Sequence, residues 1–234
     1  MKKILLNIGL PIGLLIIAVF SIGPGCTSNA GLDQLSNLDN DGHVFPSVVI
    51  GTQKWMQKNL DVSKYRNGDV IPQVTDPTAW AGLTTGAWCY YQNDSANGII
   101  YGRMYNWYAV TDSRGIAPAG WHVATDADWT TLITYLGGDA LAGGKMKETG
   151  TTHWTSPNTA ADNSSAFTDL PGGYFKENGA FYDIGLSSYW WCATEQDPTT
   201  AWDRSLSNSD GIAYKSFGNK KAGFSVRCVK YKFY

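Results

Sequence analysis

The sequence predicts an α+β domain in which short helices precede a run of antiparallel strands. Residues 126–136 have the apolar spacing of a helix, whereas residues 174–231 contain several short β-prone segments separated by turn residues. The chain also combines 26 glycines, 10 tryptophans and 13 tyrosines with only 16% charged residues. This composition is typical of a loop-rich fold whose long connections are held by buried aromatic rings.

The clearest helix is expected over residues 126–136. Thr125 precedes it as an N-cap and Asp128 follows three positions later, which is the arrangement of a capping box. Asp126 and Asp128 also suit the positive end of the helix dipole, so capping explains them without acid–base chemistry. An apolar stripe at i, i+3, i+4 and i+7 comes next and is expected to face the core; it consists of Trp129, Leu132, Ile133 and Leu136.

Strands are expected on both sides of this helix. Residues 48–60 contain two β-prone patches separated at Gly51, which indicates a strand pair with a tight turn. Residues 174–182 have the pattern of a hairpin around an Asn-Gly turn. Further strands are expected at residues 189–194, 201–206, 212–217 and 224–231.

The alternation of side chains along a strand assigns faces within two of these segments. Trp190 and Cys192 are expected to share one face, with Trp191 on the other. In the last strand Cys228 is expected to face the core. It shares that face with Phe224 and Val226, opposite Ser225 and Arg227.

The first 25 residues have the pattern of a secretory signal peptide. Lys2 and Lys3 precede an apolar run, residues 8–20, that is short for a membrane-spanning helix. Cys26 follows small residues, where a bacterial lipoprotein carries its acylated cysteine. An uncleaved membrane anchor and an ordinary signal with a stray cysteine are the alternatives. We expect a signal peptide over 1–25, a flexible tether over 26–46 and one domain over 47–234.

The net charge and the expected cellular location limit the classes of partner. Removing the leader, which contains two lysines and no acid, changes the formal net charge from −2 to −4. A mildly acidic domain without a basic block argues against nucleic acid. We expect one partner to be the membrane, through a lipid anchor, and another to be a glycan or a surface protein. The expected location is the cell envelope, at the outer membrane or cell surface, with the periplasmic side also open.

Eight blocks of the sequence resemble the Fibrobacter succinogenes major paralogous domain and occur in that family's order over residues 48–231. The resemblance implies a C-type-lectin-like fold, a looped mixed domain closed by a terminal strand beside the first. It also implies a secreted or lipid-anchored protein, but no activity, because the family's molecular function is largely unassigned. The blocks are GTQKWMQKNL (51–60), YRNGDVIP (65–72), GAWCYY (86–91), YGRMYNWYAV (101–110), APAGWHVATDADW (117–129), PGGY (171–174), YWWCATE (189–195) and GFSVRCVKY (223–231).

Three cysteines follow Cys26, which in an oxidising compartment predicts one disulfide and one free thiol. Their spacing does not suit zinc. Members of the family commonly have serine at the position of Cys192, and Ala117 stands where some have a further cysteine. The resemblance therefore implies a Cys89–Cys228 disulfide with Cys192 free. A Cys192–Cys228 bond is the alternative, because both thiols are expected to face inward.

An enzyme is the second class of function that the resemblance raises. Formylglycine-generating oxidases share the expected fold, but their chemistry needs a close pair of reactive cysteines near the C-terminus. Cys192 and Cys228 are 36 positions apart and have no neighbouring basic cluster to lower their pKa. The three histidines, His43, His122 and His153, form no recognisable triad. We therefore expect no catalytic residue and no cofactor, and a hydrogen-bonded packing role for His122.

A non-catalytic binding or adhesion module is the preferred interpretation. Trp80, Trp154 and Trp202 lie in polar stretches and are the expected exposed rings for a ligand. Trp107, Trp121, Trp129 and Trp190 are expected in the core. The loop over residues 156–163 offers a weak Ca²⁺ site with oxygen ligands from Asn158, Asp162 and Asn163, although Asx turns are the default interpretation of such a loop.

We predict that Cys26→Ala abolishes membrane retention without unfolding the domain, because the lipid would be attached to that thiol. Detergent phase partitioning of the wild type and the variant measures retention. If the variant still enters the detergent phase, the leader acts as an uncleaved helix and the assignment of a lipoprotein is wrong.

Overall fold

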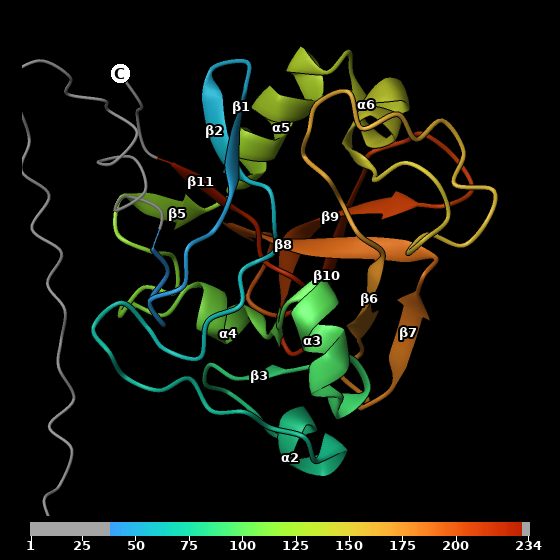
Figure 1. Ribbon diagram of the computed structural model, residues 1–234. Helices are drawn as coiled ribbons and strands as arrows, with labels where there is room; N and C mark the ends of the chain where they lie inside the picture. Colours follow the sequence, from blue (N-terminus) through green and yellow to red (C-terminus); the bar gives the residue numbers. More distant parts are fainter. Residues whose placement is uncertain (1–37, 231–234) are drawn as a thin grey trace, which may run out of the picture.

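The computed structural model describes residues 38–230 of the 234-residue chain (Figure 1). The expected signal peptide, the lipidation site Cys26 and the first part of the expected tether lie outside these residues. Within residues 38–230, no helix is both long enough and apolar enough to cross a membrane.

One antiparallel sheet joins the two ends of the described chain. Its strands lie in the order β1-β2-β11-β5, so the last strand pairs with the first hairpin (Figure 1). The expected strand pair and its turn at Gly51 are confirmed. The four strands are β1 (Ser47–Ile50), β2 (Gln53–Met56), β5 (Trp121–Val123) and β11 (Cys228–Lys230).

A second sheet of five strands has the order β10-β9-β8-β6-β7, and all its pairs are antiparallel except the β6–β8 pair. The expected hairpin over residues 174–182 is confirmed as the β6–β7 pair. The strands are β6 (Gly172–Phe175), β7 (Phe181–Ile184), β8 (Ser187–Glu195), β9 (Thr200–Ser207) and β10 (Tyr214–Asn219).

The strand expected over residues 224–231 is only partly regular. Residues 228–230 form β11, but the residues before it do not follow one neighbouring strand. Phe224 exchanges backbone hydrogen bonds with Tyr105, whereas the N–H of Ser225 donates to the carbonyl of Tyr189. The segment therefore passes between the two sheets, and both of its faces are buried.

The expected helix is confirmed as α5 (Asp126–Tyr135), with both hydrogen bonds of the capping box between Thr125 and Asp128. The remaining helical segments are short and lie in the connections between strands. The structure is thus α+β, as expected. The short segments are α2 (Pro77–Ala81), η1 (Tyr91–Asn93), α3 (Ser95–Tyr101), α4 (Trp107–Val110) and α6 (Asp139–Met146), with a two-stranded sheet of β3 (Trp88–Cys89) and β4 (Met104–Tyr105).

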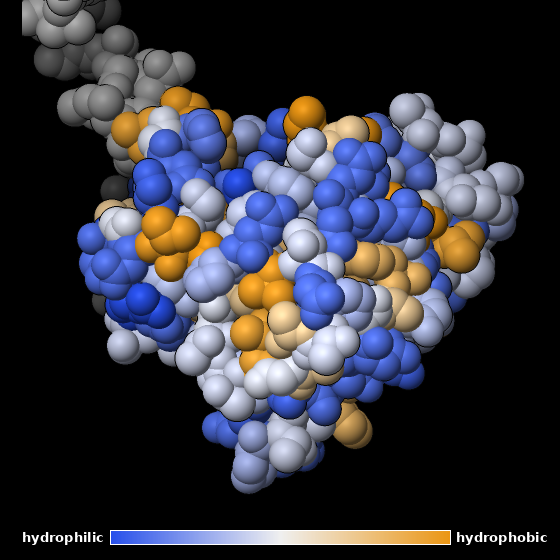
Figure 2. Space-filling view, turned by 90° about the horizontal axis from the view of Figure 1, so that it is seen from below, coloured by the Kyte–Doolittle hydropathy of each residue, from blue (hydrophilic) through white to orange (hydrophobic). Residues whose placement is uncertain are grey.

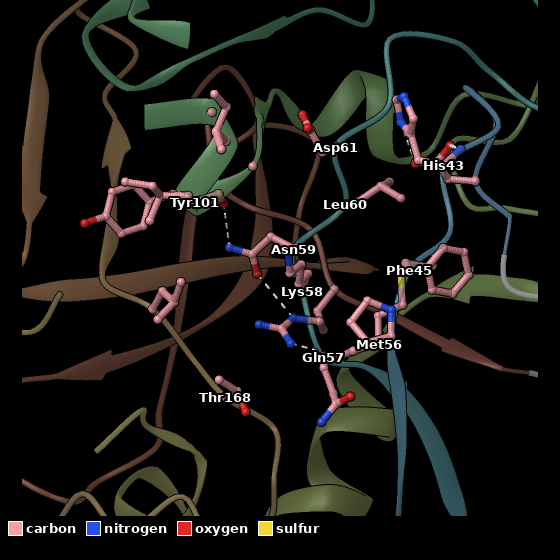
Figure 3. Close-up of a pocket in the computed structure, with 18 of the residues that line it drawn as sticks. His43, Phe45, Met56, Gln57, Lys58, Asn59, Leu60, Asp61, Tyr101 and Thr168 are labelled. Atoms are coloured by element: carbon pink, nitrogen blue, oxygen red, sulfur yellow. Dashed lines mark hydrogen bonds and ion pairs between the residues drawn. The ribbon is translucent and has the colours of Figure 1, made fainter. Parts of the chain in front are cut away.

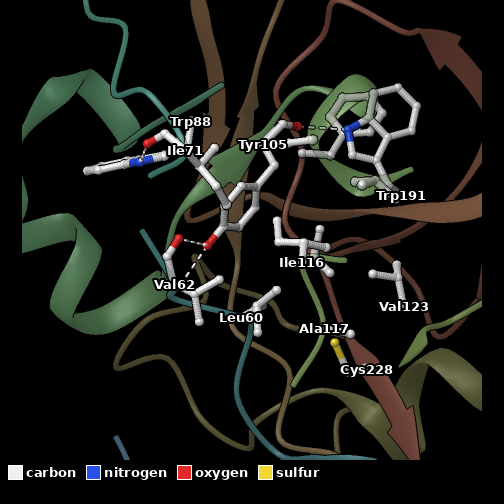
Figure 4. Packing of buried hydrophobic residues seen from close by; sticks show 14 of the residues in the cluster. Leu60, Val62, Ile71, Trp88, Tyr105, Ile116, Ala117, Val123, Trp191 and Cys228 are labelled. Carbon is white, nitrogen blue, oxygen red and sulfur yellow. Dashed lines mark hydrogen bonds between the residues drawn. The ribbon is translucent and has the colours of Figure 1, made fainter. Parts of the chain in front are cut away.

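Buried apolar side chains form three clusters on the two sides of the sheets. Trp190 and Cys192 belong to the cluster that also contains the buried face of α5, whereas Trp191 belongs to another, shown in Figure 4 with Tyr105 and Cys228. The face assignment made from strand alternation is therefore confirmed for β8. The third cluster packs around β3 and α2.

The three cysteines of the described range are free, buried thiols. They belong to the three different clusters, and Cys89 and Cys228 lie in different sheets. The Cys89–Cys228 disulfide implied by the resemblance is therefore not formed, and Cys192–Cys228 is not formed either. The inward orientation of Cys192 and Cys228 is confirmed, since both are 0% exposed.

Residues 38–46, which composition assigns to a flexible tether, pack against the domain instead. The Phe45 ring lies edge-on to Trp121 at a centroid distance of 5.1 Å and is only 8% exposed. The carboxylate of Asp41 accepts hydrogen bonds from the backbone N–H and the hydroxyl of Ser63. The domain therefore begins before residue 47. Composition gave no signal of this, because the contacts join residues far apart in the sequence.

Two of the tryptophans expected to be exposed are buried. Trp80 is 0% exposed and Trp154 is 1% exposed, and the indole N–H of Trp154 donates to the carbonyl of Asp169 at 3.0 Å. The expectation that these rings are available to a ligand is therefore wrong. Trp202 is half-buried, with its ring between Lys215 and Phe217. The four tryptophans expected in the core are buried: Trp107, Trp121, Trp129 and Trp190.

We predict that Trp154→Ala lowers the free energy of unfolding by about 3–5 kcal/mol, because it removes a fully buried ring and leaves a cavity. Urea denaturation of the two proteins gives the difference. Trp202→Ala is the matched control and should cost clearly less, because that ring is already partly in water. Equal losses for the two variants would contradict the burial described above.

Candidate ligand-binding site

A cavity of about 450 Å³ lies where the N-terminal segment meets the residues after β2 and the end of α3. Figure 3 shows His43 and Phe45 on one side of it and Tyr101 on the other, with Asn59 between them. The lining residues are Asp39, His43, Val44, Phe45, Pro46, Met56, Gln57, Lys58, Asn59, Leu60, Asp61, Gly98, Ile99, Ile100, Tyr101, Gly102, Glu148, Thr168, Leu170 and Arg227.

The side-chain amide of Asn59 organises the floor of this cavity. Its Nδ2 donates to the carbonyl of Tyr101 at 3.0 Å and to the hydroxyl of Ser225 at 3.2 Å. Its Oδ1 accepts from the indole N–H of Trp190 at 2.9 Å and from Nε of Arg227 at 3.2 Å. The amide thus makes all four hydrogen bonds of which it is capable, and its position is fixed.

Arg227 lies beneath the cavity and is only 1% exposed. Its Nη1 donates to the carbonyls of Met56 and Phe167 at 2.8 and 3.1 Å, and its guanidinium lies 4.2 Å from the centroid of the Phe167 ring. Burial lowers the pKa of Arg227 to about 10, which leaves the side chain protonated at neutral pH. Among residues 38–230, no hydrogen-bond partner is present for Nη2.

No carboxylate neutralises this charge. Asp169 is the acid that acts on Arg227 most strongly, but within the described part of the chain it forms no ion pair with Arg227. Burial raises the pKa of Asp169 to about 8, although the hydroxyl of Ser188 donates to it at 2.6 Å. Asp169 therefore acts on Arg227 only from a distance, and within residues 38–230 no carboxylate forms an ion pair with the guanidinium.

The other charged residues that line the cavity are three acids and one lysine. The carboxylate of Asp39 lies 3.4 Å from Nδ1 of His43, that of Asp61 pairs with Arg103, and that of Glu148 lies 2.7 Å from Nδ1 of His153. Lys58 is exposed and has no side-chain partner among residues 38–230. Each acid thus has a partner within the described part of the chain, whereas the ammonium group of Lys58 has none.

The walls and the rim of the cavity are largely aliphatic. Ile99 is 83% exposed, Ile100 44% and Val44 64%, and all three line the cavity. On the face seen from below, Figure 2 shows apolar side chains in several patches among polar ones. A ligand that combines an anionic group with an apolar portion fits this arrangement.

None of the candidate binding residues expected from the sequence lines this cavity, with Trp80 and Trp154 in the core and Trp202 on β9. The residues that form its floor, Asn59 and Arg227, were not singled out. The available signal was an asparagine next to the last residue of the GTQKWMQKNL block and a lone arginine within the apolar SVRCV block. Alternation puts Arg227 on the face opposite Cys228, and only the tertiary structure shows that this face is covered as well.

The loop expected to hold Ca²⁺ uses its polar groups for turns. Nδ2 of Asn158 donates to the carbonyls of Glu148 and Gly150. Asp162 accepts from the N–H of Ser164, and Asn163 exchanges hydrogen bonds with Thr168, so the three side chains have separate partners. Residues 38–230 contain no group of three or more His, Cys, Asp or Glu side chains placed to hold a metal ion.

His122 makes the hydrogen bond expected of a packing residue. Its Nε2 lies 2.8 Å from the carboxylate of Asp128, which also completes the capping box of α5. That carboxylate accepts from Thr125 as well, and these contacts lower the pKa of Asp128 despite the opposing effect of burial. The pair therefore has a structural explanation in the start of the helix.

Comparison with known proteins identifies the family. The sequence model of the Fibrobacter succinogenes major domain matches residues 48–230, which is most of the chain, so the protein belongs to this family. No curated protein and no solved structure matches the chain significantly. The family expected from the eight sequence blocks is therefore confirmed.

We predict that Asn59→Ala lowers the free energy of unfolding by about 2–5 kcal/mol. The variant leaves the indole N–H of Trp190 and Nε of Arg227 buried without their acceptor, and each such loss costs about 1–3 kcal/mol. Urea denaturation measures the change. The neighbouring variant Lys58→Ala is the control and should stay within about 0.5 kcal/mol of the wild type. A similar small effect of Asn59→Ala would show that this amide does not hold the cavity floor together.

Proposed function

We propose that this member of the Fibrobacter succinogenes major domain family is a non-catalytic, lipid-anchored binding protein of the cell envelope. Its ligand would be a peptide or protein segment that ends in a free carboxylate beside an aliphatic side chain. One observation carries the proposal: Arg227 is buried, charged and without a counterion, and its Nη2 is unpaired beneath a cavity. A bound carboxylate would supply the missing partner.

The apolar rim favours a chain terminus over a purely polar anion. A carboxylate placed against Arg227 and Lys58 would bring the neighbouring side chain against the aliphatic wall that includes Leu60 and Ile100. Burial of such a side chain adds roughly 1.5–3 kcal/mol to binding before entropic costs. The charged group would provide specificity, and the apolar contact would provide much of the affinity.

The proposed anchor agrees with the position of the cavity. Residues of the segment 39–46 form one of its walls, and Leu38 follows Cys26 by 12 positions. A chain of that length spans at most about 43 Å when fully extended. A lipid on Cys26 would therefore keep the cavity close to the membrane surface, where it meets proteins of the same envelope.

The C-type-lectin-like architecture is part of the proposal. The pairing of β11 with β2, the position of α5 after β5 and the long irregular connections are the features that support it. These features also explain why the cavity lies where the two ends of the domain meet, since its floor is formed by Asn59, just after β2, and Arg227, just before β11.

The state of the cysteines supports a non-catalytic role over the alternative of an enzyme related to formylglycine-generating oxidases. Burial raises the pKa of both Cys192 and Cys228 to about 12, so neither thiol supplies a thiolate at neutral pH. They also belong to separate clusters of the core. That alternative requires two accessible thiols close together.

The test compares peptides that differ only at the C-terminus, which is either a free carboxylate or an amide. We predict that the full-length protein in detergent binds some members of a peptide library that end in an aliphatic residue and a free carboxylate. Amidation of the same peptides should weaken binding about 10- to 100-fold, because a charge-assisted hydrogen bond contributes about 1.5–3 kcal/mol. Fluorescence anisotropy with labelled peptides measures both affinities.

Lys58→Glu should weaken binding of the free-carboxylate peptides about fivefold or more, because it reverses an unpaired charge at the cavity. Lys64→Glu is the matched control, since Lys64 is also exposed but does not line the cavity. Equal binding of carboxylate and amide peptides, or equal effects of the two lysine variants, would reject the proposed site.

A further inference from the structure

A second hollow lies on the five-stranded sheet, on the face opposite α5. Residues 203 and 205 of β9 reach this face, because the intervening Arg204 points the other way and pairs with Asp126 of α5 at 2.7 Å. The hollow is lined by Tyr174, Lys176, Glu177, Tyr189, Asp203, Ser205, Tyr214, Lys215, Ser216, Phe217, Gly218, Asn219, Ala222 and Phe224. We refer to it as the sheet groove.

Asp203 lies at the floor of the sheet groove without a protein partner. The residue is only 3% exposed, yet among residues 38–230 its carboxylate has no hydrogen bond and no ion pair. Burial raises the pKa of Asp203 to about 7, and the charge of Arg204 opposes this only in part. The carboxylate oxygens of Asp203 are not fully enclosed, so they open onto the groove, where a donor from outside the chain can reach them.

Aromatic rings form one wall of the sheet groove. The rings of Tyr174 and Tyr189 lie 4.8 Å apart, and that of Phe224 packs 5.6 Å from Tyr189 in a stacked arrangement. The hydroxyl of Tyr189 donates to Asp183 at 2.8 Å, which fixes the orientation of the ring. A Cβ on Gly218 would lie 2.9 Å from the Phe224 ring, so the absence of a side chain there leaves room for this wall.

Two hydroxyls complete the polar part of the floor. Ser216 lies directly opposite Asp203 in the β9–β10 register, and Ser205 follows Asp203 by two positions on the same face. Neither serine hydroxyl has a hydrogen-bond partner within the described part of the chain. Lys215 lies opposite Arg204 in the same register and, like it, pairs with Asp126 of α5.

We propose that the sheet groove binds a neutral oligosaccharide, whose hydroxyls donate to Asp203 and exchange hydrogen bonds with Ser205 and Ser216 while a sugar face packs on Tyr174 and Tyr189. Aromatic faces beside a row of small hydrogen-bonding groups suit a polyhydroxylated ring, which is apolar on its faces and polar at its edge. The groove is open along the edge strand β10, so an extended chain of sugars fits better than a single enclosed one. This site is independent of the cavity at Arg227.

The test is titration of the full-length protein in detergent with linear tetrasaccharides of glucose, xylose or mannose, followed by intrinsic fluorescence. We expect at least one of these probes to bind in the micromolar to millimolar range. Asp203→Asn should weaken that binding tenfold or more, because the amide is a poorer acceptor. The melting temperature of this variant should be unchanged or higher, because a buried charge without a partner has been removed.

Ser216→Ala provides a second variant at an exposed position and should weaken binding two- to fivefold. Asp139→Asn, an exposed carboxylate outside the groove, and Lys58→Glu at the other cavity should leave sugar binding unchanged. The proposal is overturned if none of the tetrasaccharides binds, if Asp203→Asn binds them as well as the wild type, or if that variant melts at a lower temperature. Selective binding of an organic cation such as choline in place of the sugars would also overturn it.

Discussion

The side-chain amide of Asn59 is the interaction on which both the fold and the candidate site depend. Its four hydrogen bonds reach residues that are 42, 131, 166 and 168 positions away in the sequence. Because an unpaired amide in the core is costly, the four partners must arrive together for any of them to be satisfied. The amide therefore joins the end of β2 to α3, to β8 and to the segment before β11. The pairing of the last strand with the first hairpin follows from this closure.

The same network fixes Arg227 before any ligand arrives. Its guanidinium is held by Asn59, by two backbone carbonyls and by the face of Phe167. Within residues 38–230, only Nη2 has no hydrogen-bond partner. Ordering an arginine costs affinity when it occurs on binding, whereas here it accompanies folding. A ligand that binds the folded form alone also stabilises it, by about 2.7 kcal/mol when present at 100 times its dissociation constant. Closure of the domain and binding of the proposed anionic ligand would thus be thermodynamically coupled.

Sequence analysis succeeded where the decisive interactions are local. The capping box of α5, the β6–β7 hairpin and the alternation along β8 all involve residues a few positions apart. It failed where distant segments cover one another. Trp154 lies in a polar loop, but Lys147 and the carbonyl of Asp169 reach it from outside that loop. Alternation likewise put Arg227 on the face opposite Cys228, which was expected to face the core, although both faces of that segment are buried.

The cavity and the sheet groove share one physical feature: each contains a buried charged group that has no ion-pair partner among residues 38–230. Arg227 is 1% exposed and Asp203 is 3% exposed, and neither has an ion-pair partner among residues 38–230 on its own side of the core. Removing a charge from water without pairing it opposes folding, and apolar side chains of similar volume would stabilise the domain more. The cost is offset only when a group of complementary chemistry enters from outside. Because the two charges have opposite sign, an anion suited to Arg227 would be repelled by Asp203, so the two sites would select different partners on one domain.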